Sequence, residues 1–103
     1  DVPVEPINPI ANYYASVTRK TLKGTPEGGF EASQKMTRMA ALEAYTINNA
    51  YGAFEENIKG CIKKGFLADF TVLSQDIISI KQDQILDTEI VYTIVDGKIM
   101  FKR

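Results

Sequence analysis

Hydrophobic positions near the start of the chain recur with the period of an α-helix. Apolar side chains fall at i, i+3, i+4 and i+7, which places one stripe along Ile10, Tyr13, Tyr14 and Val17. Asn8 is a good N-cap residue, and Pro9 suits the first helical position. Arg19 and Lys20 follow, where cations favour a helix C-terminus. The pattern predicts a helix over residues 9–18.

A longer helical stripe lies beyond residues 20–35, a stretch that contains several Gly and Pro and predicts a loop. Loops of this length inside a compact domain are often functional. Apolar residues then recur at helical spacing, at Met36, Ala40, Ala44, Ile47, Tyr51 and Phe54. With Thr37 as N-cap, this spacing predicts a second helix that frays near Gly52.

From Ile58 onward the hydrophobic period becomes that of β-structure. The residues from Ile58 predict a short strand that ends in a Lys-Lys-Gly turn at residues 63–65. A second strand is predicted over residues 70–73, which are rich in β-formers. One short helical turn is predicted over residues 84–86.

The clearest strand pattern covers residues 89–95. Asp96-Gly97 then predicts a type I′ hairpin turn, with a returning strand over residues 98–102. The prolines at positions 3, 6 and 9 predict an extended loop at the start of the chain. A helical first half and a β second half predict an α+β fold, or pieces of two adjoining domains.

Composition excludes several classes of site. The chain has 103 residues, 45% hydrophobic and 24% charged, with a net charge of −1, so electrostatic binding of nucleic acid or an anionic membrane is not supported. No apolar run could span a bilayer, and no signal-peptide pattern is present. The absence of histidine excludes a Ser-His-Asp, Cys-His or His-rich metal site built from this chain alone. The single cysteine excludes an internal disulfide and is compatible with the cytoplasm.

Few residues are candidates for chemistry, and each has a structural interpretation. Asp1, in a proline-stiffened loop, has the chemistry of a metal ligand or general base, but an ordinary charged terminus is favoured from spacing alone. Cys61 has no histidine to activate it and is expected to be a small buried hydrophobe. Asp69 is expected to pair with a lysine or to accept backbone N–H groups in a turn.

The tyrosines at positions 13, 14, 45 and 51 fall at helical spacing, which is typical of core or domain-interface residues. Gly28-Gly29 lacks any phosphate-loop pattern. The residues alone therefore show no complete catalytic constellation. Because the chain starts at Asp1 rather than Met, we expect a processed product or a fragment of a longer protein.

Four stretches match motifs in a fixed order. The first, Asp1-Val-Pro-Val-Glu-Pro-Ile-Asn-Pro, resembles the segment SDxPVxPxNP without its Ser, and residues 37–50 resemble the helix TxxxALxxYTxNxA. Residues 60–73 resemble GxIxxGxxADxxVL, and residues 94–99 resemble the closing hairpin VxGKxV. Taken together in this order, the four stretches resemble the C-terminal end of metal-dependent amidohydrolases of amidohydrolase family 3. The branch includes N-substituted formamide deformylase-like proteins, and some members are labelled exoenzyme regulatory protein.

The resemblance implies a specific place in a larger fold. Residues 1–57, a loop plus two helices, would be the end of a (β/α)₈ catalytic barrel, whose active site lies at the C-terminal ends of its strands. Residues 58–103 would be the C-terminal strands of a flanking composite β-sandwich, which strands from the N-terminus of the protein usually complete. Asp1 would end the last barrel strand, contact the metal and act as general base, whereas Asp69 would be structural.

The implied function is that of a C-terminal fragment of a metal-dependent hydrolase acting on carbon–nitrogen bonds other than peptide bonds. Metal-activated water would attack an amide or formamide carbon of a small-molecule substrate, with Asp1 as base. A divalent metal, expected to be zinc, would belong to the full-length parent, and the chain alone is expected to bind none and to be inactive. The alternative is a stand-alone regulatory or interaction module that binds a protein partner through exposed β edges. In both cases, unpaired strand edges predict a homo-oligomer. No nucleic-acid or membrane partner is expected.

Overall fold

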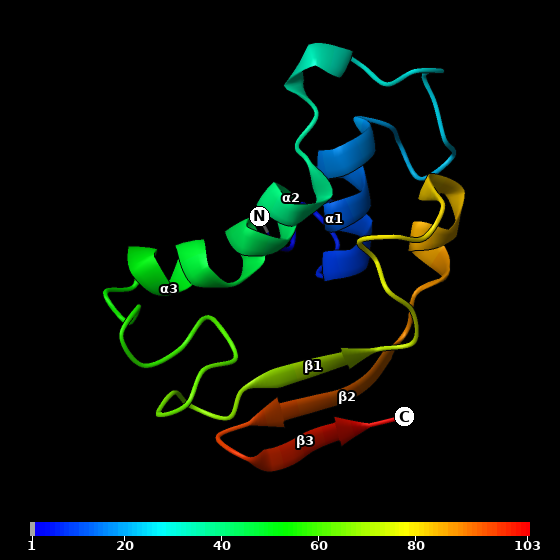
Figure 1. Ribbon diagram of the computed structural model, residues 1–103. Helices are drawn as coiled ribbons and strands as arrows, with labels where there is room; N and C mark the ends of the chain where they lie inside the picture. The colour runs from blue at the N-terminus through cyan, green and yellow to red at the C-terminus, as the bar shows by residue number, and fades with distance from the viewer. Residues whose placement is uncertain (1) are drawn as a thin grey trace.

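The predicted α+β class is confirmed by the arrangement of helices over a small sheet. The computed structural model describes residues 2–103, with helices on one side of a three-stranded antiparallel sheet of order β1-β2-β3 (Figure 1). The elements, in chain order, are α1 (Pro9–Thr18), the 3-10 helix η1 (Ala32–Gln34), α2 (Arg38–Tyr45), α3 (Ile47–Gly52), β1 (Phe70–Leu73), the 3-10 helix η2 (Gln82–Asp87), β2 (Ile90–Val95) and β3 (Lys98–Lys102).

Helix α1 has the bounds and the cap that the sequence predicts. The side chain of Asn8 accepts a hydrogen bond from the backbone N–H of Ile10 at 3.0 Å, and Pro9 occupies the first turn. The helix ends where Arg19 adopts a left-handed conformation and its N–H donates to the carbonyl of Ala15. The predicted apolar stripe of this helix is buried.

The second predicted helix is two helices. Thr37 caps α2 as expected and accepts a hydrogen bond from the N–H of Ala40 at 3.1 Å. The helix stops at Tyr45, however, because Thr46 leaves the helical region with φ −123° and ψ −94°. The hydroxyl of Thr46 donates to the carbonyl of Leu42 at 2.9 Å, a side-chain bond that competes with the helical pattern. A separate helix, α3, then follows.

The predicted strand beginning at Ile58 is wrong. This segment is a loop closed by a hydrogen bond from the N–H of Leu67 to the carbonyl of Ile58 at 2.8 Å, and it has no partner strand. Gly60, at φ +106°, lies against α3, so closely that an added Cβ would lie 2.8 Å from the Cβ of Ala50. Packing on a helix therefore replaces strand pairing here.

The remaining β predictions are confirmed. Strand β1 pairs with β2, and β2 pairs with β3, both antiparallel. Asp96 and Gly97 both have positive φ, 49° and 77°, as a type I′ turn requires. The predicted helical turn near residue 85 is part of η2.

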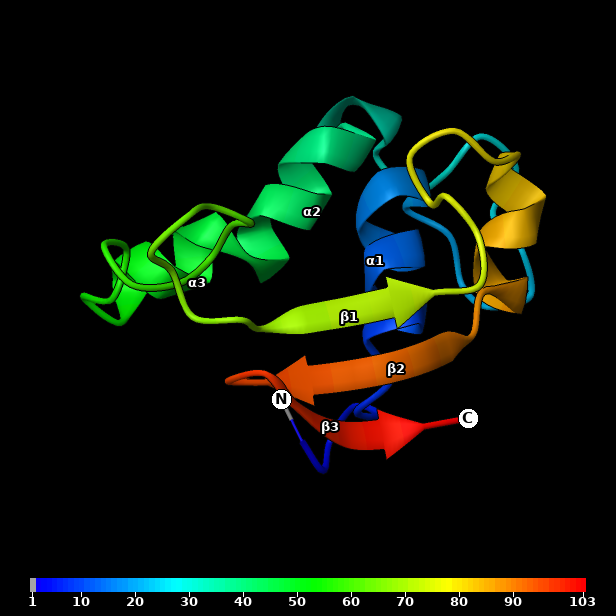
Figure 2. The same cartoon turned by 60° about the horizontal axis from the view of Figure 1, so that its bottom comes forward.

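The hydrophobic core lies where α1 packs between α2 and η2 (Figure 2). Both the helical first half and the second half of the chain contribute to it. Its buried members are Ile10, Tyr13, Tyr14, Val17, Ala41, Ile77 and Ile85. Leu73 at the end of β1 and Ile90 at the start of β2 pack against its edge, so the sheet joins the core only at one end.

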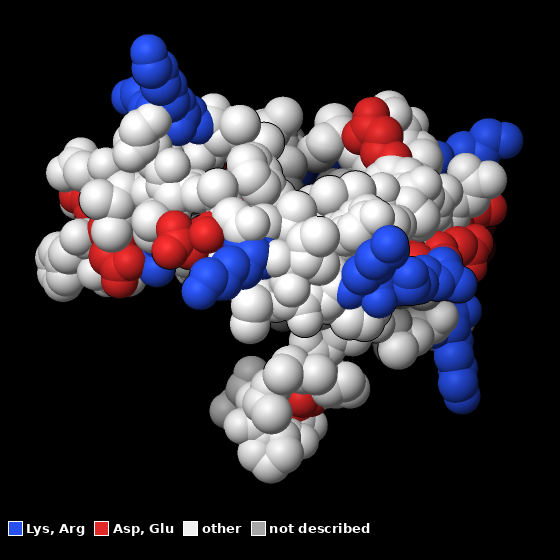
Figure 3. All heavy atoms as spheres, turned by 90° about the horizontal axis from the view of Figure 1, so that it is seen from below, with Lys and Arg blue, Asp and Glu red and all other residues white. Residues whose placement is uncertain are grey.

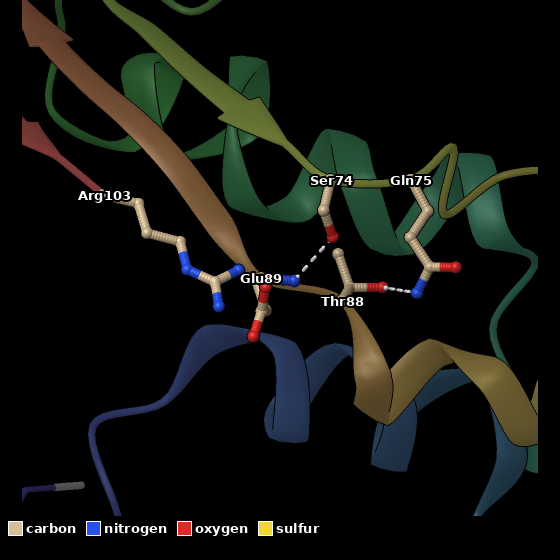
Figure 4. A network of polar contacts seen from close by, with 5 residues as sticks. All are labelled: Ser74, Gln75, Thr88, Glu89 and Arg103. Atoms are coloured by element: carbon tan, nitrogen blue, oxygen red, sulfur yellow. Dashed lines mark hydrogen bonds and ion pairs between the residues drawn. The ribbon is translucent and has the colours of Figure 1, made fainter.

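A polar network ties the end of β1 to the start of β2 (Figure 4). The N–H of Glu89 donates to the hydroxyl of Ser74 at 2.9 Å, and the side-chain amide of Gln75 donates to Thr88 at 3.1 Å. Arg103 forms an ion pair with Glu89. These contacts join the two ends of the segment between β1 and β2, which contains η2. They therefore hold the sheet and η2 together.

Candidate functional site

Asp1, the predicted catalytic residue and metal ligand, lies outside the residues that the structure describes. The residues that follow it, 2–7, are all exposed, and the first one held by a cap interaction is Asn8. Among residues 2–103, no group of three or more His, Cys, Asp or Glu side chains could hold a metal ion. The described part of the chain therefore offers no metal centre of its own.

A groove of about 1270 Å³ lies between the helices and the sheet. One wall is made by α2 and α3 and the other by all four residues of β1 with part of β2, while the loop that contains Gly60 closes one end. Within residues 2–103, strand β1 pairs only with β2, so its other backbone edge has no partner strand among them. The groove therefore combines apolar walls with an unpaired strand edge.

The charged residues that line this groove are engaged in structural contacts. Lys59 pairs with Glu55 at 2.6 Å, and the hydrogen bond from this pairing raises the pKa of the lysine. Asp69 accepts a hydrogen bond from the backbone N–H of Asp96 at 2.8 Å, which confirms its predicted role as a turn carboxylate. Asp76 accepts from the hydroxyl of Ser79 at 2.8 Å. The groove is thus an apolar surface rather than an acid–base site.

Asp76 also organises the turn that follows β1. Besides Ser79, its carboxylate accepts from the backbone N–H of Ile78 at 2.9 Å. These hydrogen bonds, with a smaller attraction from Arg38, hold the pKa of Asp76 below its ordinary value. The ionised carboxylate therefore fixes the backbone of this turn.

The sequence prediction that Cys61 is buried is wrong. Its side chain is exposed and lies along the groove. Tyr13 and Tyr14 are buried core residues, as predicted, whereas Tyr45 and Tyr51 are exposed, at 38% and 70%, so a domain-interface role remains a prediction for these two. Because α2 and α3 lie on the far side of the groove from the sheet, nothing within residues 2–103 covers these side chains.

Arg38 lies beside this groove and makes long-range structural contacts that the sequence interpretation missed. Its Nη1 lies 3.1 Å from the carbonyl oxygen of Ile77 and 3.2 Å from that of Ile78, and it also contacts that of Ile80. The hydroxyl of Tyr13 donates to the same Ile77 carbonyl at 3.1 Å. The position of Arg38 in the sequence was a signal of such contacts. A cation in the first turn of a helix opposes the helix dipole, so acceptors from other parts of the chain are expected around it.

Burial raises the pKa of the Tyr13 phenol, although the positive charge of Arg38 partly opposes this effect. The phenol therefore stays neutral and keeps its proton as a hydrogen-bond donor.

The sheet exposes apolar residues that a closed domain would cover. None of the residues of β1, β2 and β3 is buried, and every residue of β3 is exposed, including Ile99 at 61% and Met100 at 66%. Seen from below the sheet, the molecule presents a largely uncharged surface with a few clusters of charge (Figure 3). No helix within residues 2–103 is long and apolar enough to cross a membrane.

Comparison with known proteins shows which family this α+β chain matches. The model of the Amidohydrolase family matches residues 1–101. The putative amidohydrolase YtcJ of Bacillus subtilis (strain 168) is 31% identical over 103 residues, which are 100% of this chain and 20% of that protein. The N-substituted formamide deformylase of Arthrobacter pascens is 28% identical over 103 residues, which are 100% of this chain and 18% of that protein. No solved structure matches the chain significantly.

These matches define the class of the chain: it is an α+β segment of a hydrolase family. The chain belongs to the amidohydrolase family, as its motifs predicted. It spans about one fifth of the length of the curated relatives it matches.

Proposed function

We propose that this chain is the C-terminal part of a hydrolase that cleaves carbon–nitrogen bonds other than peptide bonds in small amide-type substrates. The observation that carries the proposal is the family match over residues 1–101. The names of both relatives, one an amidohydrolase and one a formamide deformylase, point to the same reaction class. They do not favour the alternative of a stand-alone interaction module.

The catalytic contribution of this chain is assigned to Asp1. Its carboxylate would accept a proton from water as the water oxygen bonds to the amide or formamide carbon. It would then give that proton to the nitrogen as the carbon–nitrogen bond breaks. The support is the position of Asp1 at the head of the family-like segment that leads into α1.

A divalent metal, expected to be zinc, is part of the proposal for the longer protein, where it would act as a Lewis acid. The described residues do not form a site for it: the sequence has no histidine, and residues 2–103 hold no cluster of ligating side chains. We therefore place the other ligands on polypeptide outside this chain and derive no step through the metal.

We further propose that residues 1–57 end a (β/α)₈ barrel and that residues 58–103 are strands of a composite β-sandwich. The apolar groove beside the free edge of β1 supports this division, because it offers a surface on which further strands could pair and pack. The uncovered apolar residues of β3 support it as well. By the same argument, the isolated chain would associate with itself.

The test is an activity measurement on the longer gene product that contains this chain. Asp1→Asn should lower kcat on N-substituted formamides and other small amides by roughly 100- to 10,000-fold, because the general base is lost. Asp87→Asn, at an exposed carboxylate of η2, is the matched control and should leave kcat unchanged. The 103-residue chain alone should show no turnover with any divalent metal. Full activity of the Asp1→Asn enzyme would overturn the assignment.

A further inference from the structure

Phe54, just after α3, occupies a backbone position that usually belongs to glycine. Its φ is +60°, in the left-handed region, where a bulky residue is uncommon because its Cβ crowds the backbone. The N–H of Phe54 donates to the carbonyl of Tyr51 at 3.0 Å, and the N–H of Glu55 donates to that of Ala50 at 2.8 Å. These two bonds form a Schellman motif, whose left-handed residue is most often glycine. The end of α3 therefore holds an aromatic residue under backbone strain.

The described part of the chain leaves the side chain of Phe54 almost entirely in water. It is 91% exposed, the highest value for a large apolar side chain among residues 2–103. Tyr51, one helical turn earlier, is 70% exposed. Ala50 and Ala53 line the groove beside β1, but Tyr51 and Phe54 do not. These two residues, which we call the α3 aromatic pair, therefore lie outside the groove, on a helix at the opposite end of the molecule from η2 (Figure 1).

The turn that carries Phe54 is fixed by its neighbours. The backbone N–H of Lys59 donates to the carbonyl of Glu55 at 3.2 Å, and the side chains of these two residues form an ion pair at 2.6 Å. Gly60 packs on α3 so closely that an added Cβ would lie 2.8 Å from the Cβ of Ala50. Because this backbone is already ordered, the Phe54 ring could be buried by a neighbouring surface at a low cost in conformational entropy.

We propose that Phe54, together with Tyr51, anchors this chain in an apolar pocket of the polypeptide that lies outside residues 1–103 of the longer protein. Aromatic side chains buried in pockets supply much of the energy of protein interfaces, and strained residues cluster where the strain serves a function. The chain spans about one fifth of the length of the relatives it matches, so most of the polypeptide that could cover the pair lies outside it. The inference rests on the proposed function only in placing this chain within a longer protein.

The first experiment identifies what covers Phe54. A photo-crosslinking analogue of phenylalanine replaces Phe54 in the longer gene product, and the crosslinked peptides are mapped by mass spectrometry. The expected product joins position 54 to a peptide outside residues 1–103 of the same molecule. A product of twice the mass would show a second copy as the occupant and overturn the proposal. A crosslink only within residues 1–103, or no crosslink, would overturn it as well.

The second experiment compares the melting temperature, Tm, of Phe54→Gly with that of the wild type in two proteins. In the longer gene product, Tm should fall by a few degrees, because a buried ring is lost. In the 103-residue chain, Tm should stay unchanged or rise, because glycine adopts the left-handed conformation without strain. Glu56→Ala, at an exposed residue of the same turn, is the control and should change neither Tm.

A fall in Tm of equal size in both proteins, or no fall in the longer gene product, would overturn the role of Phe54 as an anchor. Neither experiment needs enzymatic activity. A longer gene product that folds but cleaves no amide would refute the proposed function, whereas the crosslink would still decide the anchor.

Discussion

Two regions of this molecule have similar apolar content but different degrees of burial. Around α1, the apolar side chains are covered: Tyr13 and Tyr14 are 2% and 5% exposed, and Ile85 of η2 is fully buried. In the sheet and α3, Ile99, Met100 and Tyr51 are each more than 60% exposed. We call these the closed region (α1, α2 and η2) and the open region (β1, β2, β3 and α3).

The difference lies in the number of layers that pack together. In the closed region, α1 has neighbours on two sides, so its stripe is removed from water and contributes to stability. In the open region, the sheet packs on the core only through Leu73 and Ile90 at one end and otherwise faces the helices across a groove. A three-stranded sheet without a packed face contributes little to stability. Apolar composition alone therefore does not make a core. The open region has the pattern of a buried element, and in our proposal further polypeptide supplies its second layer.

The largest expected effect compares one isoleucine from each region. Ile85→Ala should lower the free energy of unfolding by about 2–5 kcal/mol, because it leaves a cavity at a fully buried site. Ile99→Ala, at a site 61% exposed, should change it by less than about 0.5 kcal/mol. Urea denaturation of the 103-residue chain measures both. Equal losses would mean that the sheet is as well packed as the helices.

A smaller effect concerns acid sensitivity, which should arise in the turn between β1 and η2 that contains Asp76. The pKa of Asp76 lies below its ordinary value of 3.8, so the ionised carboxylate stabilises the fold above that value. This contribution is lost as the pH falls below 3.8 and through the folded-state pKa. The difference in unfolding free energy between the wild type and Asp76→Asn should therefore shrink below pH 3.8.

Asp87→Asn is the control for this pH series, since its carboxylate is exposed and no hydrogen bond to it is seen in the described residues. An Asp76→Asn difference that stays constant as the pH is lowered from above 3.8 to well below it would contradict the assigned role of the turn.

The sequence predicted the elements that depend on local interactions. The start of α1, the start of α2 and the hairpin turn could be predicted from the sequence. Each depends on residues that interact with neighbours a few positions away, namely Asn8, Thr37 and Asp96-Gly97. Asp69 was also placed correctly, as a turn acceptor. The family motifs added the class of the protein, which composition and spacing could not supply.

What was missed depends on tertiary packing. The apolar stripe through residues 36–54 continues past Thr46, so hydrophobic periodicity could not show that the helix is interrupted there. At the interruption, the hydroxyl of Thr46 donates a hydrogen bond to the backbone. The strand expected from Ile58 and the burial expected for Cys61 both assumed a neighbouring layer that residues 2–103 do not provide. The contacts of Arg38 were missed because their carbonyl acceptors lie 39 to 42 residues away in the sequence.

The central claim is that the open region is completed by further polypeptide of a longer hydrolase. The most direct test is amide hydrogen exchange of the 103-residue chain beside that of the longer gene product. We predict that amides of β1 (Phe70–Leu73) become markedly more protected in the longer protein, whereas those of α1 (Pro9–Thr18) change little. Equal protection of β1 in the two proteins would contradict the claim.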